Sequence, residues 1–309
     1  MSKKETIKAP KNRVKRTEMQ KRNEFWGWMF ILPWLIGTIY FFIIPMVNAG
    51  VFAFSYISFD ETGTVYTPAG LDNFIYLFTV DANFIPNLVD AMGKMLYEVP
   101  VVVVFSLLIA MVLRGNFKGH TFYRAMFFLP VVISSGVVIT ILRDYVMASG
   151  SASTADQQAY MFNLPDFKNL TDLFGLPLGI VEFATTVVNG FFDITWKSGV
   201  QIILLLVAVN HISPSYYEVA DMEGATAWEK LWKVTIPMIS PTILVVIIYT
   251  IIDSFTDYSN VIMKMIDKFS DKGDYSYATT IGLVYFILVG LLIALVTLLM
   301  RKVTKNAEY

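Results

Sequence analysis

The sequence predicts an all-α membrane protein with six transmembrane helices and with both ends of the chain in the cytoplasm. The 309 residues are 55% hydrophobic and only 16% charged, whereas about a quarter of the residues in a typical soluble domain are charged. Several apolar runs approach the ~20 residues that a helix needs to cross the hydrocarbon core of a bilayer. Lysine and arginine are concentrated in alternate segments between these runs, and this asymmetry sets the predicted orientation.

The chain begins with a basic segment. Residues 1–24 contain nine lysines and arginines and no periodic apolar face, so we expect a cytoplasmic arm there. Residues 25–59 then carry no charge over 35 positions, which is far longer than the apolar core of a signal peptide. We therefore expect one transmembrane domain over residues 25–300, followed by a cytoplasmic tail over residues 301–309.

Six apolar segments are predicted to cross the membrane. They lie at about 26–56, 94–113, 122–142, 197–213, 240–262 and 276–300. The first is longer than a perpendicular crossing requires, so we expect it to tilt, with kinks at Pro33 and Pro45. Charged residues border the second span and enter the fifth, so these two helices are expected to face the bundle interior or a water-filled cavity.

The basic residues support an inside location for the N-terminus. In that orientation 17 of the 24 lysines and arginines lie on the cytoplasmic side and seven lie outside, as the positive-inside rule requires. Two long segments, 57–93 and 143–196, then lie outside. Loops of this length usually have a function, and these two could form small caps over the outer mouth.

A charged segment, residues 213–240, interrupts the apolar pattern between the fourth and fifth spans. Pro214, flanked by serines, is a helix-start signal, and residues 215–223 are predicted to form a short helix. Gly224 can adopt a positive φ and end that helix. Residues 226–235 are predicted to form a second short helix. The segment should therefore be a stiff helix–turn–helix unit on the cytoplasmic side, hereafter the elbow.

The elbow has features of a docking element. Pro237 is predicted to stop its second helix ahead of the fifth span. Ala220 and Ala225 would let a partner approach closely, and Glu218 offers a carboxylate to a basic group or a backbone N–H. The alternative is an ordinary amphipathic connector that lies in the lipid headgroup layer.

The elbow carries a motif with a family resemblance. Residues 218–237 read E-x-A-x-x-x-G-x9-V-x-I-P, which resembles the EAA motif of bacterial ABC importer permeases, EAA-x3-G-x9-I-x-L-P. The glutamate, the second alanine, the glycine and the proline match at the family's spacing. Three further regions resemble sugar-type permeases related to the larger maltose-transporter subunit. Their first span resembles FILPWLIGTIYFFIIP, their first external loop resembles SFD and GLDNF, and their third span resembles YRAMFFLPVVIS.

The resemblance covers nearly all of residues 25–300, with one departure. The family often has a Gly-Gly-Pro stretch after the fifth span, whereas residues 263–276 of this chain begin MKMIDKFSDKGD. This external loop is unusual, and the sequence does not assign it a role. The departure bears on the substrate more than on the class of protein.

The resemblance implies a type I ABC importer permease fold, a location in the bacterial inner (cytoplasmic) membrane, and import of sugars or oligosaccharides. In that family the elbow docks in a cleft on an ATPase subunit. The coupling residues implied here are Glu218, Ala220, Asp221, Gly224, Ala225 and Pro237. The implied partners are a second homologous permease subunit, two ATPase subunits, an extracellular solute-binding protein and membrane lipid, with no nucleic acid. ATP and Mg would bind to the ATPase, and no cofactor is expected in this chain.

The fifth span contains a polar cluster that could contact cargo. Asp253 and Asp257 are four residues apart and share a helix face, and Tyr258 and Asn260 follow them. Carboxylates and an amide can bond to hydroxyl groups, and an aromatic ring suits the C–H face of a sugar, so these four residues are the predicted substrate pathway. The alternative is that they pair with a neighbouring helix or lie in external water.

Several functions lack the residues that they require. The chain has no cysteine, which excludes disulfides and thiolate chemistry. It has no G-x-x-x-x-G-K-[ST] phosphate loop and no histidine pattern with metal spacing, so we predict a transport subunit that is not an enzyme and has no metal site.

The competing transport hypothesis is an ion-coupled secondary transporter with Asp253 and Asp257 as a proton or cation relay. No inverted internal repeat supports it, and it gives the elbow no role. A membrane-embedded enzyme would need catalytic motifs that the sequence does not contain.

Overall fold

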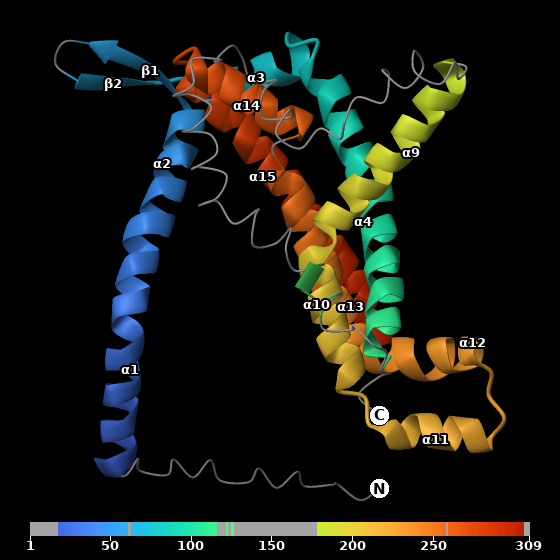
Figure 1. Ribbon diagram of the computed structural model, residues 1–309. Helices are drawn as coiled ribbons and strands as arrows, with labels where there is room; N and C mark the ends of the chain where they lie inside the picture. The colour runs from blue at the N-terminus through green and yellow to red at the C-terminus, as the bar shows by residue number, and fades with distance from the viewer. Residues whose placement is uncertain are drawn as a thin grey trace, which may run out of the picture. The chain divides into compact units, whose positions relative to one another are not determined.

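The computed structural model describes residues 18–60, 63–115, 178–257 and 259–305, together with residues 122, 125 and 126. Helices dominate this part of the chain (Figure 1). Four of the described helices are long and apolar enough to cross a membrane, and a bent pair over residues 199–222 would raise the number to five. A mainly helical, membrane-type fold is therefore confirmed. The third predicted span, 122–142, lies almost entirely outside the described residues.

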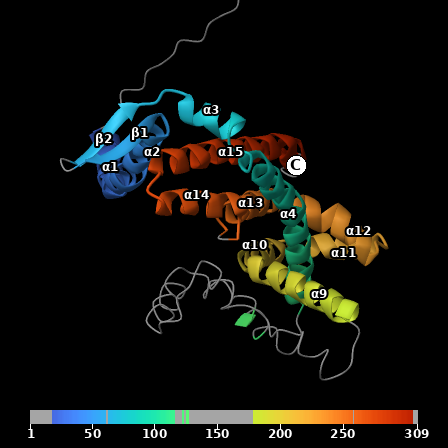
Figure 2. The ribbon, with the colours of Figure 1, turned by 90° about the horizontal axis from the view of Figure 1, so that it is seen from above.

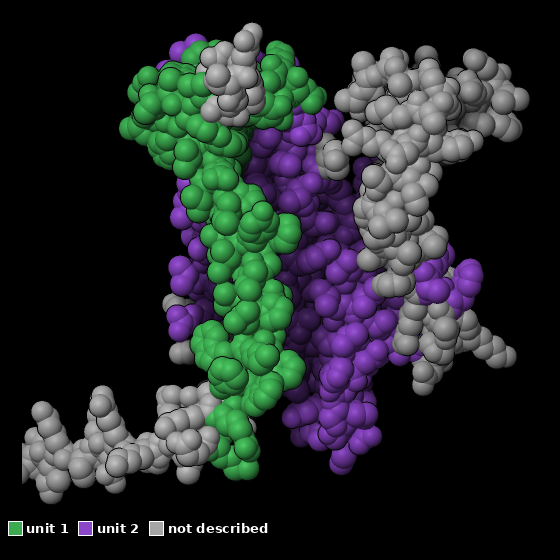
Figure 3. Space-filling view, turned by 90° about the vertical axis from the view of Figure 1, so that its left-hand side faces the viewer, with its two compact units in different colours: residues 1–77, 269–283 green, residues 78–268, 284–309 purple. Residues whose placement is uncertain are grey.

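The chain divides into two compact units, which Figure 3 colours separately. The first comprises residues 1–77 and 269–283, and the second comprises residues 78–268 and 284–309. Two helices, α14 (Val261–Asp271) and α15 (Tyr275–Lys305), contribute residues to both units.

The first unit begins with a nearly continuous helix. It consists of α1 (Glu18–Thr38), a π turn (Ile39–Ile43) and α2 (Ile44–Ala53). Helix α1 starts inside the segment that the sequence predicts as an arm. Pro33 lies within α1, and Pro45 lies in the first turn of α2 directly after the π turn, where the Ile44 N–H bonds to the Ile39 carbonyl five residues back.

The segment predicted as the first external loop is largely structured. Strands β1 (Ser55–Asp60) and β2 (Gly63–Pro68) form an antiparallel hairpin in which Ser55 pairs with Pro68, and helix α3 (Asp72–Thr79) follows. The buried Asn73 amide donates to the carbonyls of Ala53 at 3.1 Å and Ser55 at 3.4 Å, which ties α3 to the end of α2.

The start of α15 completes the first unit. Ser276 accepts a hydrogen bond from the Ile57 N–H at 2.9 Å, and Thr280 donates to the Ala53 carbonyl at 3.2 Å. The rings of Tyr76 and Tyr277 meet edge-to-face. Residues far apart in the sequence are therefore held together by hydrogen bonds as well as by ring contacts.

Three helices form the centre of the second unit. Helix α4 (Phe84–Arg114) packs against α10 (Gly199–Asn210) and α13 (Ile236–Thr256), and α10 also packs against α13 (Figure 1). Their buried apolar side chains include Val102, Ala110, Leu113, Ile202, Leu205, Val209, Ile239 and Val246. A buried hydrogen bond of 3.3 Å from the Gln201 amide to the Thr250 hydroxyl joins α10 to α13.

Helical structure extends beyond the predicted spans in two places. Helix α4 starts at Phe84 rather than near residue 94, because its first turns are amphipathic and a hydropathy window registers only the apolar part. Helix α9 (Leu178–Lys197) occupies the end of the segment predicted as the second external loop, and only Ser198 separates it from α10. Residues 143–177 lie outside the described residues.

The substitution Asn73→Ala tests the hydrogen bonds that hold helix α3 to the end of α2 and the start of β1. It removes the donor to two buried carbonyls, so the local free energy of unfolding should fall by about 1–3 kcal/mol. Hydrogen exchange followed by mass spectrometry should show faster exchange across β1 and β2. Asn83→Ala is the control, because Asn83 is exposed and its side chain does not cap α4. Equal protection of the hairpin in both variants would contradict the role given to Asn73.

Candidate functional site

The first arm of the elbow is helix α11, Pro214–Met222, which is bent by 67° away from α10. Ser213 precedes it with an extended ψ of 134°, and its hydroxyl lies 2.9 Å from that of Ser215. Pro214 occupies the first turn, where its missing N–H costs no helical bond. No residue of α11 is buried. The helix start predicted from the serine–proline signal is therefore confirmed.

The turn after α11 depends on Gly224. Its φ is +76°, a left-handed conformation that glycine adopts without steric cost. The Gly224 N–H bonds to the Asp221 carbonyl at 3.0 Å, and the Ala225 N–H bonds to the Ala220 carbonyl at 2.9 Å. These two bonds form a Schellman motif, which satisfies carbonyls at the end of the helix. The predicted role of Gly224 in ending α11 is confirmed.

A capping box starts the second arm of the elbow. Helix α12 covers Ala227–Lys230, and Thr226 is its N-cap. The Glu229 N–H donates to the Thr226 hydroxyl oxygen at 3.3 Å, and the Thr226 N–H donates to the Glu229 carboxylate at 3.0 Å. Because these bonds satisfy two N–H groups at the helix start, the turn between the two arms is fixed on both sides.

The predicted stop at Pro237 is wrong. Helix α12 continues through a π turn, Leu231–Thr235, into α13, and Pro237 lies in the first turn of α13. The Ile236 N–H bonds to the Leu231 carbonyl five residues back. This wider turn allows the helix to pass a residue that has no N–H and whose ring clashes with the preceding turn of a regular α-helix.

An ion pair braces the two arms of the elbow. Figure 2 shows α11 and α12 side by side, and the Lys230 ammonium of α12 contacts the Asp221 carboxylate of α11. The structure thus gives Asp221 an interaction within the elbow. Glu218 is exposed and makes no hydrogen bond or ion pair with the residues that the structure describes.

The elbow exposes several large apolar side chains. Met222, at the end of α11, is 89% exposed, and Trp228 of α12 is 67% exposed. The rings of Trp228 and Trp232 contact each other edge-to-face with their centroids 5.6 Å apart, and Val219 is also exposed. Contiguous apolar side chains that do not pack against their own chain are typical of surfaces that meet a partner or a membrane.

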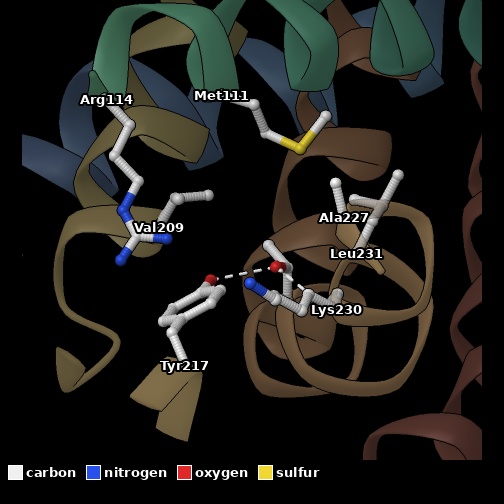
Figure 4. Close-up of a pocket in the computed structure, with 8 residues that line it drawn as sticks. Met111, Arg114, Val209, Tyr217, Ala227, Lys230 and Leu231 are labelled. Atoms are coloured by element: carbon white, nitrogen blue, oxygen red, sulfur yellow. Dashed lines mark hydrogen bonds between the residues drawn. The ribbon is translucent and has the colours of Figure 1, made fainter. Parts of the chain in front are cut away.

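A cavity of about 210 Å³ lies between the elbow and the ends of α4 and α10 (Figure 4). The Arg114 guanidinium carbon lies 4.2 Å from the centre of the Tyr217 ring. The Tyr217 hydroxyl is 2.9 Å from that of Thr235, and the Thr235 hydroxyl donates to the Lys230 carbonyl at 3.3 Å. Because the single O–H of Thr235 is used in its bond to Lys230, the Tyr217 hydroxyl is the donor in the bond between Tyr217 and Thr235. Sequence reasoning counted Arg114 only as a cytoplasmic charge and did not single out Tyr217.

The second candidate region is an ion cluster formed by Glu98 of α4, Lys197 of α9 and Asp257, which caps α13. The Lys197 ammonium lies 2.5 Å from the Glu98 carboxylate and 2.7 Å from that of Asp257. All three side chains are mostly buried. The second carboxylate oxygen of Glu98 is buried and has no hydrogen-bond partner among the described residues. A lysine shared by two carboxylates reduces the cost of placing charge inside an apolar bundle.

The four predicted pathway residues have different environments. Asp257 belongs to the ion cluster, and Asp253, one helical turn earlier, is half-buried and within electrostatic range of Lys197. Tyr258 lies outside the described residues. Asn260 is buried and donates to the Ser254 carbonyl at 3.1 Å and the Tyr285 hydroxyl at 2.8 Å, and its oxygen accepts from the Ile262 N–H at 2.9 Å.

These contacts divide the predicted pathway into groups with and without local partners. All the hydrogen-bonding groups of the Asn260 side chain are used, and the residue caps α14. Asp257 is paired with another helix, which was the alternative that the sequence left open for this cluster. From the sequence, Glu98 is only one of the charges that border the predicted second span, and Lys197 is only one of the basic residues counted on the external side. The available signal was that a lysine and a glutamate beside long apolar runs need partners.

Within the described residues no cluster of His, Asp and Glu is arranged to hold a metal ion.

Comparison with family models gives no match, whereas individual proteins match over most of the chain. The multiple sugar-binding transport system permease protein MsmF of Streptococcus mutans is 26% identical over 305 residues, which cover 93% of this chain and 97% of the relative. The probable ABC transporter permease protein YesP of Bacillus subtilis is 27% identical over 253 residues, covering 80% of this chain and 75% of the relative. The trehalose/maltose transport system permease protein MalF of Thermococcus litoralis is 24% identical, covering 88% and 92%.

Solved structures share the fold. A chain of a bacterial alginate ABC transporter, in complex with an alginate pentasaccharide-bound periplasmic protein, superposes with a TM-score of 0.61 at 20% identity. The match covers 94% of this chain and 99% of that one. The chain thus shares the fold of an ABC transporter chain. Its relatives are named as ABC transporter and sugar transport permeases, the class that the motif of the elbow resembles.

The substitution Lys197→Met tests the ion cluster. It leaves two mostly buried carboxylates without a cation, so the free energy of unfolding should fall by an amount on the order of 3 kcal/mol. Thermal unfolding in detergent micelles, followed by intrinsic fluorescence, should show a lower midpoint. The triple variant Glu98→Gln, Lys197→Met, Asp257→Asn should recover part of this loss. The control is Lys264→Met at an exposed lysine, and equal midpoints for both single variants would contradict the assignment.

Proposed function

We propose that the chain forms one half of the transmembrane pathway of an ATP-driven, binding-protein-dependent importer of sugars or oligosaccharides. In this proposal residues 25–300 cross the membrane six times, with the basic arm 1–24 and the tail 301–309 in the cytoplasm. The asymmetry of lysine and arginine between the two sides supports this orientation. The names of the relatives, which include multiple-sugar, lactose and trehalose/maltose permeases, support the substrate class.

The proposed assembly contains four further subunits. A second homologous permease completes the pathway, and two ATPase subunits bind ATP and Mg. An extracellular solute-binding protein delivers the sugar. A periplasmic protein with bound oligosaccharide accompanies the alginate transporter of similar fold, which supports a partner of this kind here.

The exposed elbow is the observation that carries the proposal. Its two arms are fixed by the Schellman motif, the capping box and an ion pair, so it can move as one body. Glu218 and the Met222 side chain remain available to a partner. The proposed coupling surface comprises Glu218, Ala220, Gly224, Ala225 and the neighbouring apolar side chains. Asp221 acts by bracing this surface, and Pro237 by shaping the join to α13.

Transport follows by alternating access. ATP binding closes the two ATPase subunits, displaces the docked elbow and opens the pathway to the outside, where the binding protein releases solute. Hydrolysis reverses the movement. ATP can shift the equilibrium between the two states only through contacts that differ between them. The elbow must therefore bind the ATPase differently in its open and closed forms.

The proposed cargo contacts lie at the end of α13. Asp253 is half-buried, and its carboxylate accepts no hydrogen bond from a residue that the structure describes, so it can accept hydrogen bonds from sugar hydroxyls. One Asp257 carboxylate oxygen contacts Lys197 at 2.7 Å, and the other accepts a hydrogen bond from the Ser259 N–H at 2.7 Å. Their remaining lone pairs are offered to sugar hydroxyls, and Tyr258 follows Asp257 in the sequence. Asn260 supports this region by fixing the start of α14.

The substitutions Gly224→Trp and Gly224→Ala test docking of the elbow. Both impose a left-handed φ on a residue with a Cβ, at a cost of about 1–2 kcal/mol. No atom of the described chain lies within 4 Å of the Cβ position, so the larger side chain meets nothing within the subunit. Gly224→Trp should therefore weaken ATPase binding at least about tenfold more than Gly224→Ala, a difference of 1.4 kcal/mol.

The measurement is the ATP hydrolysis that co-purifies with the tagged chain from solubilised membranes, normalised to the amount of the chain. Mass spectrometry of the same sample identifies the associated ATPase. Equal hydrolysis for the two variants would show that the elbow does not enter a cleft on the ATPase.

The substitution Asp253→Asn tests the cargo pathway. Loss of the charge should slow uptake about fivefold, the effect of one hydrogen bond, while ATP hydrolysis and ATPase association stay unchanged. Uptake into ATP-loaded proteoliposomes of the complete importer is measured with radiolabelled lactose, maltose and trehalose. Asp267→Asn, the same change at an exposed carboxylate of α14, is the control. If a protonophore abolishes uptake and removal of ATP does not, the ion-coupled alternative is correct instead.

A further inference from the structure

Tyr217 connects three elements of the second unit. It lies on α11, its ring faces Arg114 in the last turn of α4, and its hydroxyl reaches Thr235 in the π turn that precedes α13 (Figure 4). A guanidinium over an aromatic face is attracted by the negative electrostatic potential of the ring. The single side chain therefore makes one contact to α4 and another to the start of α13.

The rest of α11 makes few contacts of this kind. The helix buries no residue, and a cavity of about 210 Å³ separates it from Met111 of α4 and Leu231 of the π turn. A helix that is not packed into a core transmits force only through its covalent ends and its few specific contacts. Across this cavity those contacts are made by Tyr217, and the Asp221–Lys230 ion pair adds a link to α12.

The Thr235 end of the contact is rigid. Thr235 is only 4% exposed, and its hydroxyl donates to the Lys230 carbonyl within the turn. The hydrogen bond from Tyr217 to Thr235 therefore ends on the π turn itself, where the backbone changes from α12 to α13. A displacement of α11 along this bond would act on the turn that joins the elbow to a membrane-spanning helix.

We propose that Tyr217 is a positioning residue for transport, which passes the movement of α11 to α4 through Arg114 and to α13 through Thr235. The proposal rests on the proposed function of the elbow and adds a second route to it. In addition to the covalent path through α12, motion of the first arm reaches two transmembrane helices through one side chain. The cavity beside Tyr217 provides space in which α11 can shift without losing packed apolar contacts.

The two contacts can be removed separately. Tyr217→Phe deletes the hydroxyl that bonds to Thr235 and keeps the ring under Arg114. Arg114→Gln deletes the cation and keeps the hydroxyl bond. Tyr216→Phe is a matched control, because Tyr216 is the neighbouring tyrosine, is exposed and does not line the cavity.

The experiment uses the complete importer, purified with its ATPase and second permease subunits and reconstituted into ATP-loaded proteoliposomes. The probe is whichever of radiolabelled lactose, maltose and trehalose the wild-type importer takes up fastest. The readout is the number of sugar molecules transported for each ATP hydrolysed. A merely structural contact would change the yield of complex but not this ratio.

We expect each single variant to lower the ratio about fivefold, the change that one hydrogen bond or one cation–π contact produces. The double variant should lower it by the product of the two effects, because the contacts reach different helices. Tyr216→Phe should keep the wild-type ratio.

Two results would overturn the proposal. The first is an unchanged ratio in Tyr217→Phe and Arg114→Gln while Gly224→Trp loses its ATPase, which would leave the proposed function intact and remove Tyr217 from the coupling route. The second is loss of the assembled complex in both single variants with a normal ratio in the remaining complex, which would make Tyr217 a purely structural contact. A different result would refute the proposed function of the elbow: Gly224→Trp that binds the ATPase normally and transports the normal number of sugar molecules for each ATP hydrolysed.

Discussion

The structure depends on how the backbone passes a proline without losing the helix. A proline inside a regular α-helix removes one hydrogen bond and clashes with the preceding turn. At the join between the elbow and α13, the π turn Leu231–Thr235 directly precedes Ile236 and Pro237. The same arrangement occurs in the first helix, where the π turn Ile39–Ile43 directly precedes Ile44 and Pro45. In both places the wider turn provides hydrogen bonds across five residues, so the helix continues past the proline without becoming a loose hinge.

This backbone solution gives the elbow its mechanical value. If Pro237 ended the helix, a flexible link would separate α12 from α13, and a displacement of the elbow would be absorbed there. With the π turn in place, α12 and α13 are one hydrogen-bonded element. Helix α13 has 21 residues and so extends about 30 Å, which is close to the thickness of the hydrocarbon core. A movement imposed at the elbow can therefore reach the opposite end of the membrane-spanning helix.

The sequence predicts the parts of the molecule that depend on local chemistry. The start of α11 at Pro214 and its end at Gly224 follow from the conformational limits of proline and glycine, and both predictions are confirmed. The predicted stop at Pro237 failed because a π turn depends on packing around Thr235 as well as on the proline. Helix α9 was missed because Glu182, Asp193 and Lys197 interrupt its apolar residues. The partnership of Lys197 with Glu98 was not predictable, because it joins positions 99 residues apart.

Polar contacts at three levels along α13 constrain how this helix can move within the second unit. Tyr217 contacts the π turn at its start, Gln201 of α10 bonds to Thr250 further along, and Lys197 pairs with Asp257 at its end. The residues between these levels pack through apolar side chains, which have no preferred partner atom and allow small sliding movements. Hydrogen bonds and ion pairs instead require a defined geometry. A shift of α13 against α10 would therefore exchange a small set of specific contacts, so the two ends of the movement are discrete states rather than a continuum.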